Sequence, residues 1–308
     1  MYGVKTMNTN SIFEEGWWLD AVAPGQWKEL KIERDGELVA RWPIVLFGNK
    51  MKIPKYTQTI GIWLNPKYVQ SFADEEEIYL QLIDQLPTNV KAEWALAPEN
   101  SFYLPFVWKG FQMSVGATYV IDDLTDTDAI FSQLSKSMQR DIKQAAKKVT
   151  VEESEDIDKL IEMSLATYSR QGRAYIVKPE NLRRVFRAAK EHNACSLLAA
   201  KDAEGNVHSM TLFVYDENKC YYLVGASDPK LNAKSCANTL LLWEGIKTAS
   251  QHSKVFDFEG STIKGIGTYF RRFGSKFTYH FVIKKEGLMG ELFQILKPRI
   301  KKLLGHKK

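Results

Sequence analysis

Apolar and polar residues alternate with a period of two in several short segments, and this pattern predicts β-strands. In residues 27–47 two such runs flank Asp35-Gly36, a pair that favours a tight hairpin turn. In residues 196–226 two runs flank Glu204-Gly205-Asn206, and a third run follows them. The recurrence of strand, charged turn and strand indicates an internal duplication. Further strands are predicted over residues 90–98, 117–123, 254–259 and 277–285.

Other segments repeat their apolar residues every three or four positions, the spacing of amphipathic helices. This spacing predicts helices over residues 11–23, 74–86, 128–148, 156–169 and 181–192. It also predicts one helix before residue 255 and one after it. Hairpins followed by helix–strand crossovers imply a mixed sheet flanked by helices, an α/β fold of the α+β mixed-sheet kind. We expect two tandem domains, residues 1–148 and 149–308.

The composition is that of a folded protein whose cysteines are in the reduced form. The chain has 308 residues, 44% of them hydrophobic, and no apolar run near the roughly 18 residues of a membrane-spanning helix. The first residues show no signal-peptide pattern. Three cysteines form an odd set without metal-ligand spacing, and the five histidines do not pair at such spacing either. We therefore expect no metal site, no permanently bound cofactor and a cytoplasmic location.

Positive charge concentrates at the end of the chain. From Lys284 onward the chain has eight Lys or Arg and two Glu, a net charge of +6. The whole chain has a net charge of +5, so the rest of it carries about −1 and is close to neutral. This argues against DNA as a partner. Residues 289–308 also carry Leu and Ile at helical spacing, which predicts a basic amphipathic helix. It either makes peripheral contact with an anionic membrane or packs on the body of the protein.

Residues 253–274 combine the features expected of an active site. Asp257 and Glu259 alternate with Phe256 and Phe258, so both carboxylates would lie on one strand face, roughly 7 Å apart. A turn of small residues and a helix with paired arginines follow. The alternative is an acidic strand face exposed to solvent at a sheet edge.

The segment after residues 221–226 is rich in small and polar residues and leads into a helix. The free N–H groups at such a helix start can bind a pyrophosphate or carboxylate, although an ordinary capped helix has the same pattern. We predict donor binding by Gly225, Ser227, Asn232, Ala233, Lys234 and Ser235. Arg140, Lys143 and Lys147 share one face of the helix predicted over 128–148, and plain solvation is the simpler explanation of such a basic face.

Three motifs resemble those of FemAB-like proteins, a branch of the GNAT acyltransferase superfamily. They are DFEGS followed by YFRRFG, LSKSMQRDIKQAAKK, and TYSRQG at residues 167–172. The resemblance covers most of the chain and implies two tandem GNAT-like acyl-CoA N-acyltransferase domains, the first a degenerate copy that helps to form the cleft. The chain lacks the long helical insertion that some members carry.

The resemblance implies transfer of an acyl or aminoacyl group to an amine of a cell-envelope precursor, such as a lipid-linked glycan or peptide, or of a sugar. The co-substrate would be acyl-CoA or aminoacyl-tRNA. N-acyl transfer needs a base for the amine proton, and Glu259 is the predicted base, with Asp257 orienting a neighbour. Predicted substrate-binding residues are Tyr168, Arg170, Ser261, Lys264, Arg271, Arg272 and Lys276. The alternative is a catalytically inactive scaffold or membrane-surface protein. No Ser–His or Cys–His pair is evident, which argues against a covalent acyl-enzyme.

Overall fold

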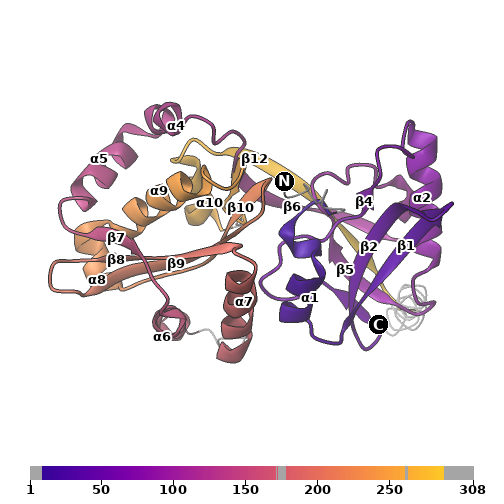
Figure 1. Ribbon diagram of the computed structural model, residues 1–308, viewed down its shortest axis with the longest axis horizontal. Helices are drawn as coiled ribbons and strands as arrows, with labels where there is room; N and C mark the ends of the chain where they lie inside the picture. Colours follow the sequence, from indigo (N-terminus) through magenta and orange to yellow (C-terminus); the bar gives the residue numbers. More distant parts are fainter. Residues whose placement is uncertain (1–8, 171, 173–177, 261–262, 288–308) are drawn as a thin grey trace, which may run out of the picture. The chain divides into compact units, whose positions relative to one another are not determined.

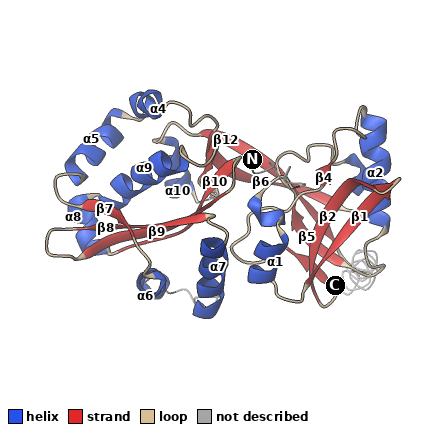
Figure 2. Ribbon diagram, viewed as in Figure 1, coloured by secondary structure: helices blue, strands red, loops and turns tan. Residues whose placement is uncertain are grey.

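The structure is a computed structural model, which describes residues 9–170, 172, 178–260 and 263–287. The described chain forms two compact units. Unit 1 takes in the described parts of Met1–Glu14, Ala23–Gly116 and His280–Lys308, and unit 2 comprises those of Glu15–Val22 and Ala117–Tyr279. The mixed α/β architecture predicted from the sequence is confirmed (Figure 2).

Unit 1 is built on the predicted hairpin. Its strands are β1 (Trp27–Arg34), β2 (Glu37–Phe47), β3 (Lys50–Lys52), β4 (Trp63–Leu64) and β5 (Lys91–Ala95), with helices η1 (Ile12–Glu14), α2 (Phe72–Asp84) and α3 (Leu104–Trp108). Asp35 and Gly36 both have positive φ angles, as a type I′ hairpin turn requires. β1, β2 and β3 pair in antiparallel order and β3 pairs with β5 in parallel, so the unit has a mixed sheet.

Aromatic side chains fill the core of unit 1. Trp42 and Trp94 are fully buried with their ring centroids 6.3 Å apart, and Phe106 of α3 packs 5.7 Å from Trp42. The indole N–H of Trp94 donates to the carbonyl of Ile60 at 2.8 Å, which satisfies its buried polar atom. Helices α2 and α3 are therefore held on the sheet by large apolar contacts.

Unit 2 contains the longer sheet, in the order β6-β11-β10-β9-β8-β7. The strands are β6 (Gln112–Ile121), β7 (Thr150–Glu153), β8 (Cys195–Lys201), β9 (Val207–Tyr215), β10 (Lys219–Ser227) and β11 (Val255–Asp257). The helices are α1 (Gly16–Val22), α4 (Thr127–Gln133), α5 (Lys136–Ala145), α6 (Ile157–Arg170), α7 (Pro179–Glu191), α8 (Pro229–Ser235), α9 (Ala237–Ala249) and α10 (Lys264–Arg271). Figure 1 shows α5 and α9 on one face of this sheet and α6 and α7 on the other.

Two predicted segments differ in detail from the structure. The helix predicted over residues 128–148 is two helices, because the chain leaves the helical conformation at Leu134 and Ser135 caps α5 by accepting from the N–H of Met138. The small-residue segment after β10 contains the short helix α8, which begins at Pro229 after the capping side chain of Asp228.

The compact units are divided differently from the two predicted domains. The predicted boundary at 148/149 falls between α5 and β7, inside unit 2, because the apolar side chains of α4 and α5 pack into the core of that unit. The last part of β12 (Lys276–Lys285) pairs with β5 in unit 1, and the last part of β6 pairs with β11 in unit 2. Each unit thus completes its sheet with a strand from a distant part of the sequence. That residue 148 ends a duplicated copy stays a prediction.

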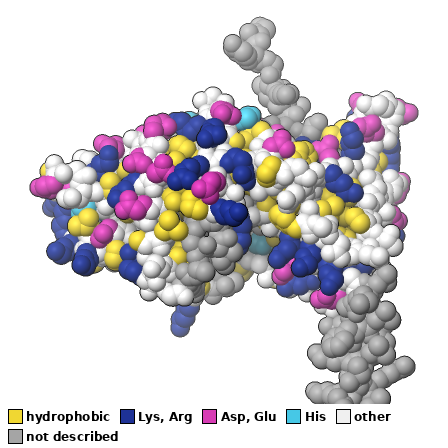
Figure 3. Space-filling model, turned by 90° about the horizontal axis from the view of Figure 1, so that it is seen from below, with side chains coloured by type: hydrophobic (Ala, Val, Ile, Leu, Met, Phe, Trp, Pro, Cys, Tyr) yellow, Lys and Arg dark blue, Asp and Glu magenta, His cyan; other side chains and the backbone are white. Residues whose placement is uncertain are grey.

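Charged side chains of both signs are interspersed over the face drawn in Figure 3. Exposed ion pairs join α7 to α6 and to the loop before it, such as Arg183 with Asp158 at 2.7 Å and Lys190 with Glu155 at 2.6 Å. In the part of the chain that the structure describes, no helix is long and apolar enough to cross a membrane. The predicted helix of residues 289–308 lies outside the described residues.

Candidate active site

Unit 2 contains a cavity at the point where the parallel strands β10 and β11 stop pairing. The two strands pair only over Lys219–Tyr221 and Val255–Asp257, and β10 then runs on with a bulge after Tyr222. The cavity has a volume of about 390 Å³. It is lined by Tyr222, Leu223, Asn238, Phe258, Glu259, Gly260, Ile266, Tyr269 and Phe270, all of unit 2.

Glu259 supplies the carboxyl group of this cavity. Its φ of +56° is in the left-handed region, unusual for a residue with a side chain, and such strain is concentrated at functional sites. Its Oε1 atom is buried and has no hydrogen-bond partner among the described residues. Burial raises the pKa of this carboxyl well above its ordinary value, and the nearby charge of Asp257 raises it further. The cavity therefore contains a polar atom that is ready to receive a ligand.

Asp257 holds the turn that carries Glu259. Its Oδ1 atom accepts from the backbone N–H of Glu259 at 2.7 Å and from the hydroxyl of Thr118. The sequence predicted that both acids share the strand face opposite the phenylalanines, with a solvated acidic face as the alternative, but Asp257 is fully buried and β11 ends there. The expectation of two carboxylates along one face of a regular strand is wrong, because β11 ends at Asp257 and the left-handed turn at Glu259 and Gly260 redirects the chain. The contact with Glu259 agrees with an orienting role for Asp257.

A hydrogen-bonded tyrosine lies on the wall formed by α10. The hydroxyl of Tyr269 accepts from the side-chain amide of Asn238 at 3.3 Å and shares a hydrogen bond with Thr239 at 3.1 Å. Burial raises the pKa of this phenol to about 12, so the hydroxyl keeps its proton at neutral pH. The cavity therefore holds a fixed proton donor as well as a carboxyl group.

The predicted donor-binding residues mostly bond to the protein itself. The Oδ1 atom of Asn232 accepts from the backbone N–H of Asn238 at 2.8 Å, and Ser235 Oγ accepts from that of Ala237 at 3.2 Å. These bonds occupy the first N–H groups of α9, so a phosphate bound there would have to displace them. Ser227 Oγ bonds to Ser209 Oγ at 2.8 Å, while Ala233 and Lys234 are exposed on α8.

Gly225 has a direct relation to the cavity. A Cβ atom at this position would lie 2.1 Å from the hydroxyl of Tyr222, which lines the cavity. Glycine thus leaves room for that ring. Donor binding by Gly225 and the other five residues of this set stays a prediction.

The structure contains a Ser–His pair that the sequence analysis did not detect. The Nδ1 atom of His208 lies 2.8 Å from Ser235 Oγ, and its Nε2 atom lies 3.0 Å from Asp202 Oδ2. The pKa of Asp202 is lowered to about 2 by its bonds to Asn206 and His208. Ser235 is only 2% exposed and does not line the cavity, so this chain of bonds fixes the junction of α8 and α9.

Four predicted substrate-binding cations lie on or after α10. Arg272 donates to Asp141 at 3.0 Å and to Ser137 at 3.1 Å, which ties α10 to α5. Lys276 pairs with Asp122 at 2.5 Å, and Arg271 donates to Thr268 at 3.3 Å. Lys264 is exposed at the first position of α10. None of these four lines the cavity, although Ile266 and Tyr269 of the same helix do.

The other predicted substrate-binding residues lie on α6 or outside the described chain. Tyr168 and Arg170 occupy the last turn of α6, where both are exposed. The pKa of Asp228, the cap of α8, is lowered chiefly by the backbone N–H of Leu231, and the charge of Arg170 adds to this effect, so Arg170 lies near the predicted donor segment. Ser261 lies outside the described residues. Substrate binding by these three residues stays a prediction.

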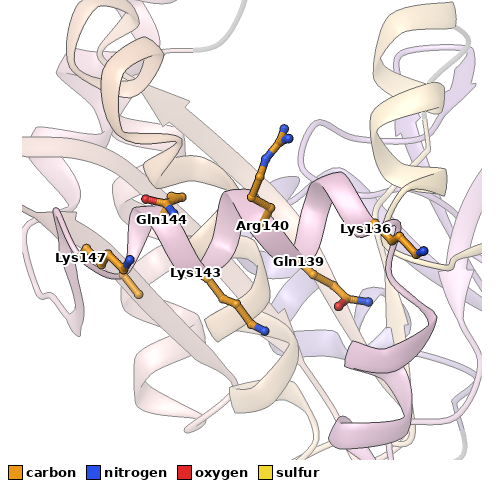
Figure 4. Close-up of a pocket in the computed structure, with 7 residues that line it drawn as sticks. Lys136, Gln139, Arg140, Lys143, Gln144 and Lys147 are labelled. Carbon is orange, nitrogen blue, oxygen red and sulfur yellow. The ribbon is translucent and has the colours of Figure 1, made fainter.

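A second, open hollow lies along the basic face of α5. Its volume is about 640 Å³, and it is lined by Lys136, Gln139, Arg140, Lys143, Gln144, Ala146 and Lys147. Figure 4 shows Lys136, Arg140 and Lys143 extending from the helix at intervals along it. The four basic side chains that line this hollow are all exposed, and no acidic side chain lines it. Solvation alone explains exposed lysines, but the hollow also suits a phosphate-bearing ligand.

Sequence reasoning missed Tyr222, Asn238 and Tyr269 as cavity residues. The available signal was an amide in the first turn of α9 and a tyrosine next to the apolar stripe of α10. Neither signal shows that the two side chains meet, because 31 positions separate them. Within the described ranges no cluster of His, Cys, Asp or Glu could hold a metal ion.

Comparison with known proteins identifies the fold. Residues 132–269 match the acetyltransferase (GNAT) domain family. The structure is similar to FemX, with a TM-score of 0.70 at 14% identity over 94% of this chain and 95% of that one. It is also similar to L-PGS from Bacillus licheniformis, with a TM-score of 0.53 at 11% identity over 92% of this chain and 90% of that one.

A tandem GNAT protein from the clavulanic acid biosynthesis pathway has a TM-score of 0.50 at 10% identity, over 86% of this chain and 85% of that one. A search of curated proteins finds no match to the sequence. The predicted tandem GNAT fold is confirmed by these similarities.

Proposed function

Because residues 132–269 match the acetyltransferase (GNAT) domain family and the fold is similar to that of FemX, we propose that the chain transfers an acyl or aminoacyl group to an amine. The acceptor amine belongs to a cell-envelope precursor or a sugar, as the motifs DFEGS and YFRRFG suggest. One observation carries the proposal. The carboxyl of Glu259, with its buried and unpartnered Oε1 atom, lines a cavity whose walls are largely aromatic.

In the proposed reaction the acceptor nitrogen attacks the donor carbonyl carbon. The new C–N bond forms as the bond from that carbon to the donor sulfur or oxygen breaks. Glu259, in its ionised form, takes the proton that the amine loses, directly or through water. The hydroxyl of Tyr269 gives a proton to the departing sulfur or oxygen, so protons and charges balance. The aromatic walls of Tyr222, Phe258 and Phe270 exclude water from the reacting groups.

The raised pKa of Glu259 suits this role. A carboxylate with an ordinary pKa near 4.5 is too weak a base to compete for an amine proton near neutral pH. Burial brings the pKa closer to that of the amine, and the backbone N–H of Glu259 bonded to Asp257 keeps the carboxyl in place. The expected consequence is an activity that rises with pH as Glu259 ionises.

The donor is acyl-CoA or aminoacyl-tRNA, and both carry phosphate groups. GNAT domains use acetyl-CoA or acyl-CoA as co-substrate, which favours a thioester donor. The basic hollow on α5 offers a place for the donor phosphates, and phosphates bound at the predicted segment Ser227–Ser235 would displace its bonds to the first N–H groups of α9. We place the reaction in the cytoplasm, at or near the inner membrane surface if the acceptor is linked to a lipid. The first unit is proposed to bind no donor.

A thermal-shift screen tests the proposal, since a ligand that binds only the folded state raises the melting temperature. The screen compares acetyl-CoA, long-chain acyl-CoA and a non-hydrolysable aminoacyl-tRNA analogue with the full chain. We expect a concentration-dependent rise with one donor class, and the same rise with Glu259→Gln, which keeps the cavity shape. If no class of donor raises the melting temperature, the alternative of a catalytically inactive scaffold is favoured.

A further inference from the structure

A chain of hydrogen bonds inside unit 2 connects β9 to the tyrosine of the cavity. Ser227 Oγ lies 2.8 Å from Ser209 Oγ, and Ser209 Oγ donates to Asn238 Oδ1 at 3.2 Å. The Nδ2 atom of Asn238 donates to the hydroxyl of Tyr269 at 3.3 Å. We call Ser209, Asn238 and Tyr269 the Ser–Asn–Tyr chain. Asn238 and Tyr269 line the cavity, whereas Ser209 is fully buried on β9 and has no part in the proposed reaction.

Ser209 has a single hydroxyl proton and three acceptors within reach. The first is Ser227 Oγ, which has a proton of its own and can donate to Ser209 instead. The second is the carbonyl of Ala226 at 3.1 Å, which lies in the antiparallel ladder opposite Met210, where backbone N–H groups are the donors. The third is Asn238 Oδ1, which has no other donor among the residues that the structure describes. The proton of Ser209 therefore goes to Asn238, because an acceptor left without a donor costs stability.

The bond from Ser209 decides which end of the Asn238 amide faces Tyr269. With the amide oxygen held by Ser209, the NH₂ group is turned to the phenol, whose oxygen accepts. The reversed amide would present its oxygen, and the hydroxyl of Tyr269 would then donate to Asn238. Thr239 Oγ1 lies 3.1 Å from the same hydroxyl and can serve as its second donor. A phenol oxygen that accepts from both neighbours keeps its own proton for a group inside the cavity.

We propose that Ser209 is a positioning residue that acts through Asn238 to aim the hydroxyl proton of Tyr269 into the cavity. This inference rests on the proposed function, in which Tyr269 gives that proton to the departing sulfur or oxygen. Hydrogen bonds donated to the phenol oxygen also stabilise the phenolate that remains when the proton has left. Burial raises the pKa of Tyr269, while its bonds to Thr239 and Asn238 act in the opposite direction, so they make the phenol a better acid.

The titration of Tyr269 tests this arrangement without turnover and without a donor. A fluorinated tyrosine placed at position 269 gives a fluorine NMR signal whose shift follows the ionisation of the phenol. Ser209→Ala lets the amide reverse, so residue 269 should ionise at a higher pH than in the chain that keeps Ser209. Ser209→Cys keeps a weak donor of similar size and should move the titration in the same direction by less.

Thr211→Val is the matched control for these variants. Thr211 is as fully buried on β9 as Ser209, and its hydroxyl has no hydrogen-bond partner in the described part of the chain. Its loss should leave the titration of residue 269 unchanged. Arg272 and Cys236 also act on the pKa of Tyr269, and both are present in every variant. Melting curves confirm that each variant is folded.

Steady-state kinetics, with the donor found by the thermal-shift screen, test the consequence for the reaction. Ser209→Ala should lower turnover on the order of tenfold with KM nearly unchanged, since a misplaced group lowers the rate and leaves binding intact. In a chain that carries Asn238→Ala the same change should have little further effect, because residues that act through one another are not additive. Thr211→Val should keep the turnover of the wild type.

Titrations of residue 269 in Ser209→Ala and Ser209→Cys that match the titration in Thr211→Val would overturn the proposal, and Ser209 would then only join β9 to β10. So would a loss of turnover from Ser209→Ala that is equally large with and without the Asn238 side chain. A shifted titration beside a fully active Tyr269→Phe would support the positioning by Ser209 and contradict the proposed proton transfer. The failure of this inference and the failure of the proposed function are therefore distinguishable.

Discussion

Replacing Gly260 with alanine tests whether the left-handed turn beneath the cavity is as tightly packed as the structure shows. Gly260 has a φ of +66°, and a Cβ atom there would lie 2.1 Å from the carbonyl oxygen of Ala117. The left-handed backbone costs alanine about 1 kcal/mol. Relieving the overlap with the backbone of β6 costs a further amount of about 1–3 kcal/mol, as for overpacked cores. The expected loss in free energy of unfolding is thus about 2–4 kcal/mol.

Gly205→Ala is the matched control, because Gly205 also has a positive φ, +83°, but a Cβ atom there meets nothing within 4 Å. Chemical denaturation of both variants gives the difference directly. We expect Gly205→Ala to lose only about 1 kcal/mol. In thermal melts Gly260→Ala should lower the midpoint by about 4–15 °C. Equal losses in the two variants would refute the close approach of Gly260 to β6.

Three further predictions concern the cavity and α10. Glu259→Gln should gain stability relative to wild type as pH rises above 4.5, because the raised pKa makes ionisation of Glu259 unfavourable in the folded state. Thermal melts at several pH values measure this gain. A difference in melting temperature between the two proteins that is constant with pH would contradict it. Tyr269→Phe should lower turnover on the order of 10²-fold with donor affinity nearly unchanged, measured by steady-state kinetics, and full activity would exclude it as the proton donor. Arg272→Ala should cost only about 0.2–1 kcal/mol of stability in denaturation, since its ion pair with Asp141 is partly exposed. A large rise in KM for that variant would instead favour the predicted substrate contact.

Local patterns in the sequence sufficed for most of the elements. The hairpin at Asp35-Gly36 follows from turn chemistry, and α9 follows from an apolar stripe that the structure buries. The break between α4 and α5 was missed because the apolar period continues through Leu134, while the cap formed by Ser135 is a single local hydrogen bond. Period alone cannot show such a break.

The candidate site was predictable only in part. Glu259 stood out because an acid precedes a small-residue turn, yet its left-handed φ depends on contacts with β6, a strand more than a hundred positions away. The pairing of β6 with β11 and of β12 with β5 is likewise invisible in local patterns, since each pair joins segments that lie far apart in the sequence. The bonds of Asn232 and Ser235 to the start of α9 depend on α8, which the sequence analysis treated as a loop.

The most direct test of the account is the turnover of Glu259→Gln, with Glu217→Gln as the control for an exposed glutamate of the same unit. Steady-state rates are measured from pH 6 to pH 9 with the donor found by the thermal-shift screen. If Glu259 is the base, its variant should lose on the order of 10²–10⁴ in turnover and the rise of rate with pH, with donor affinity unchanged. The control should keep both. A Glu259→Gln rate within about threefold of wild type, with the same pH profile, would contradict the assignment of this cavity's carboxyl as the catalytic base.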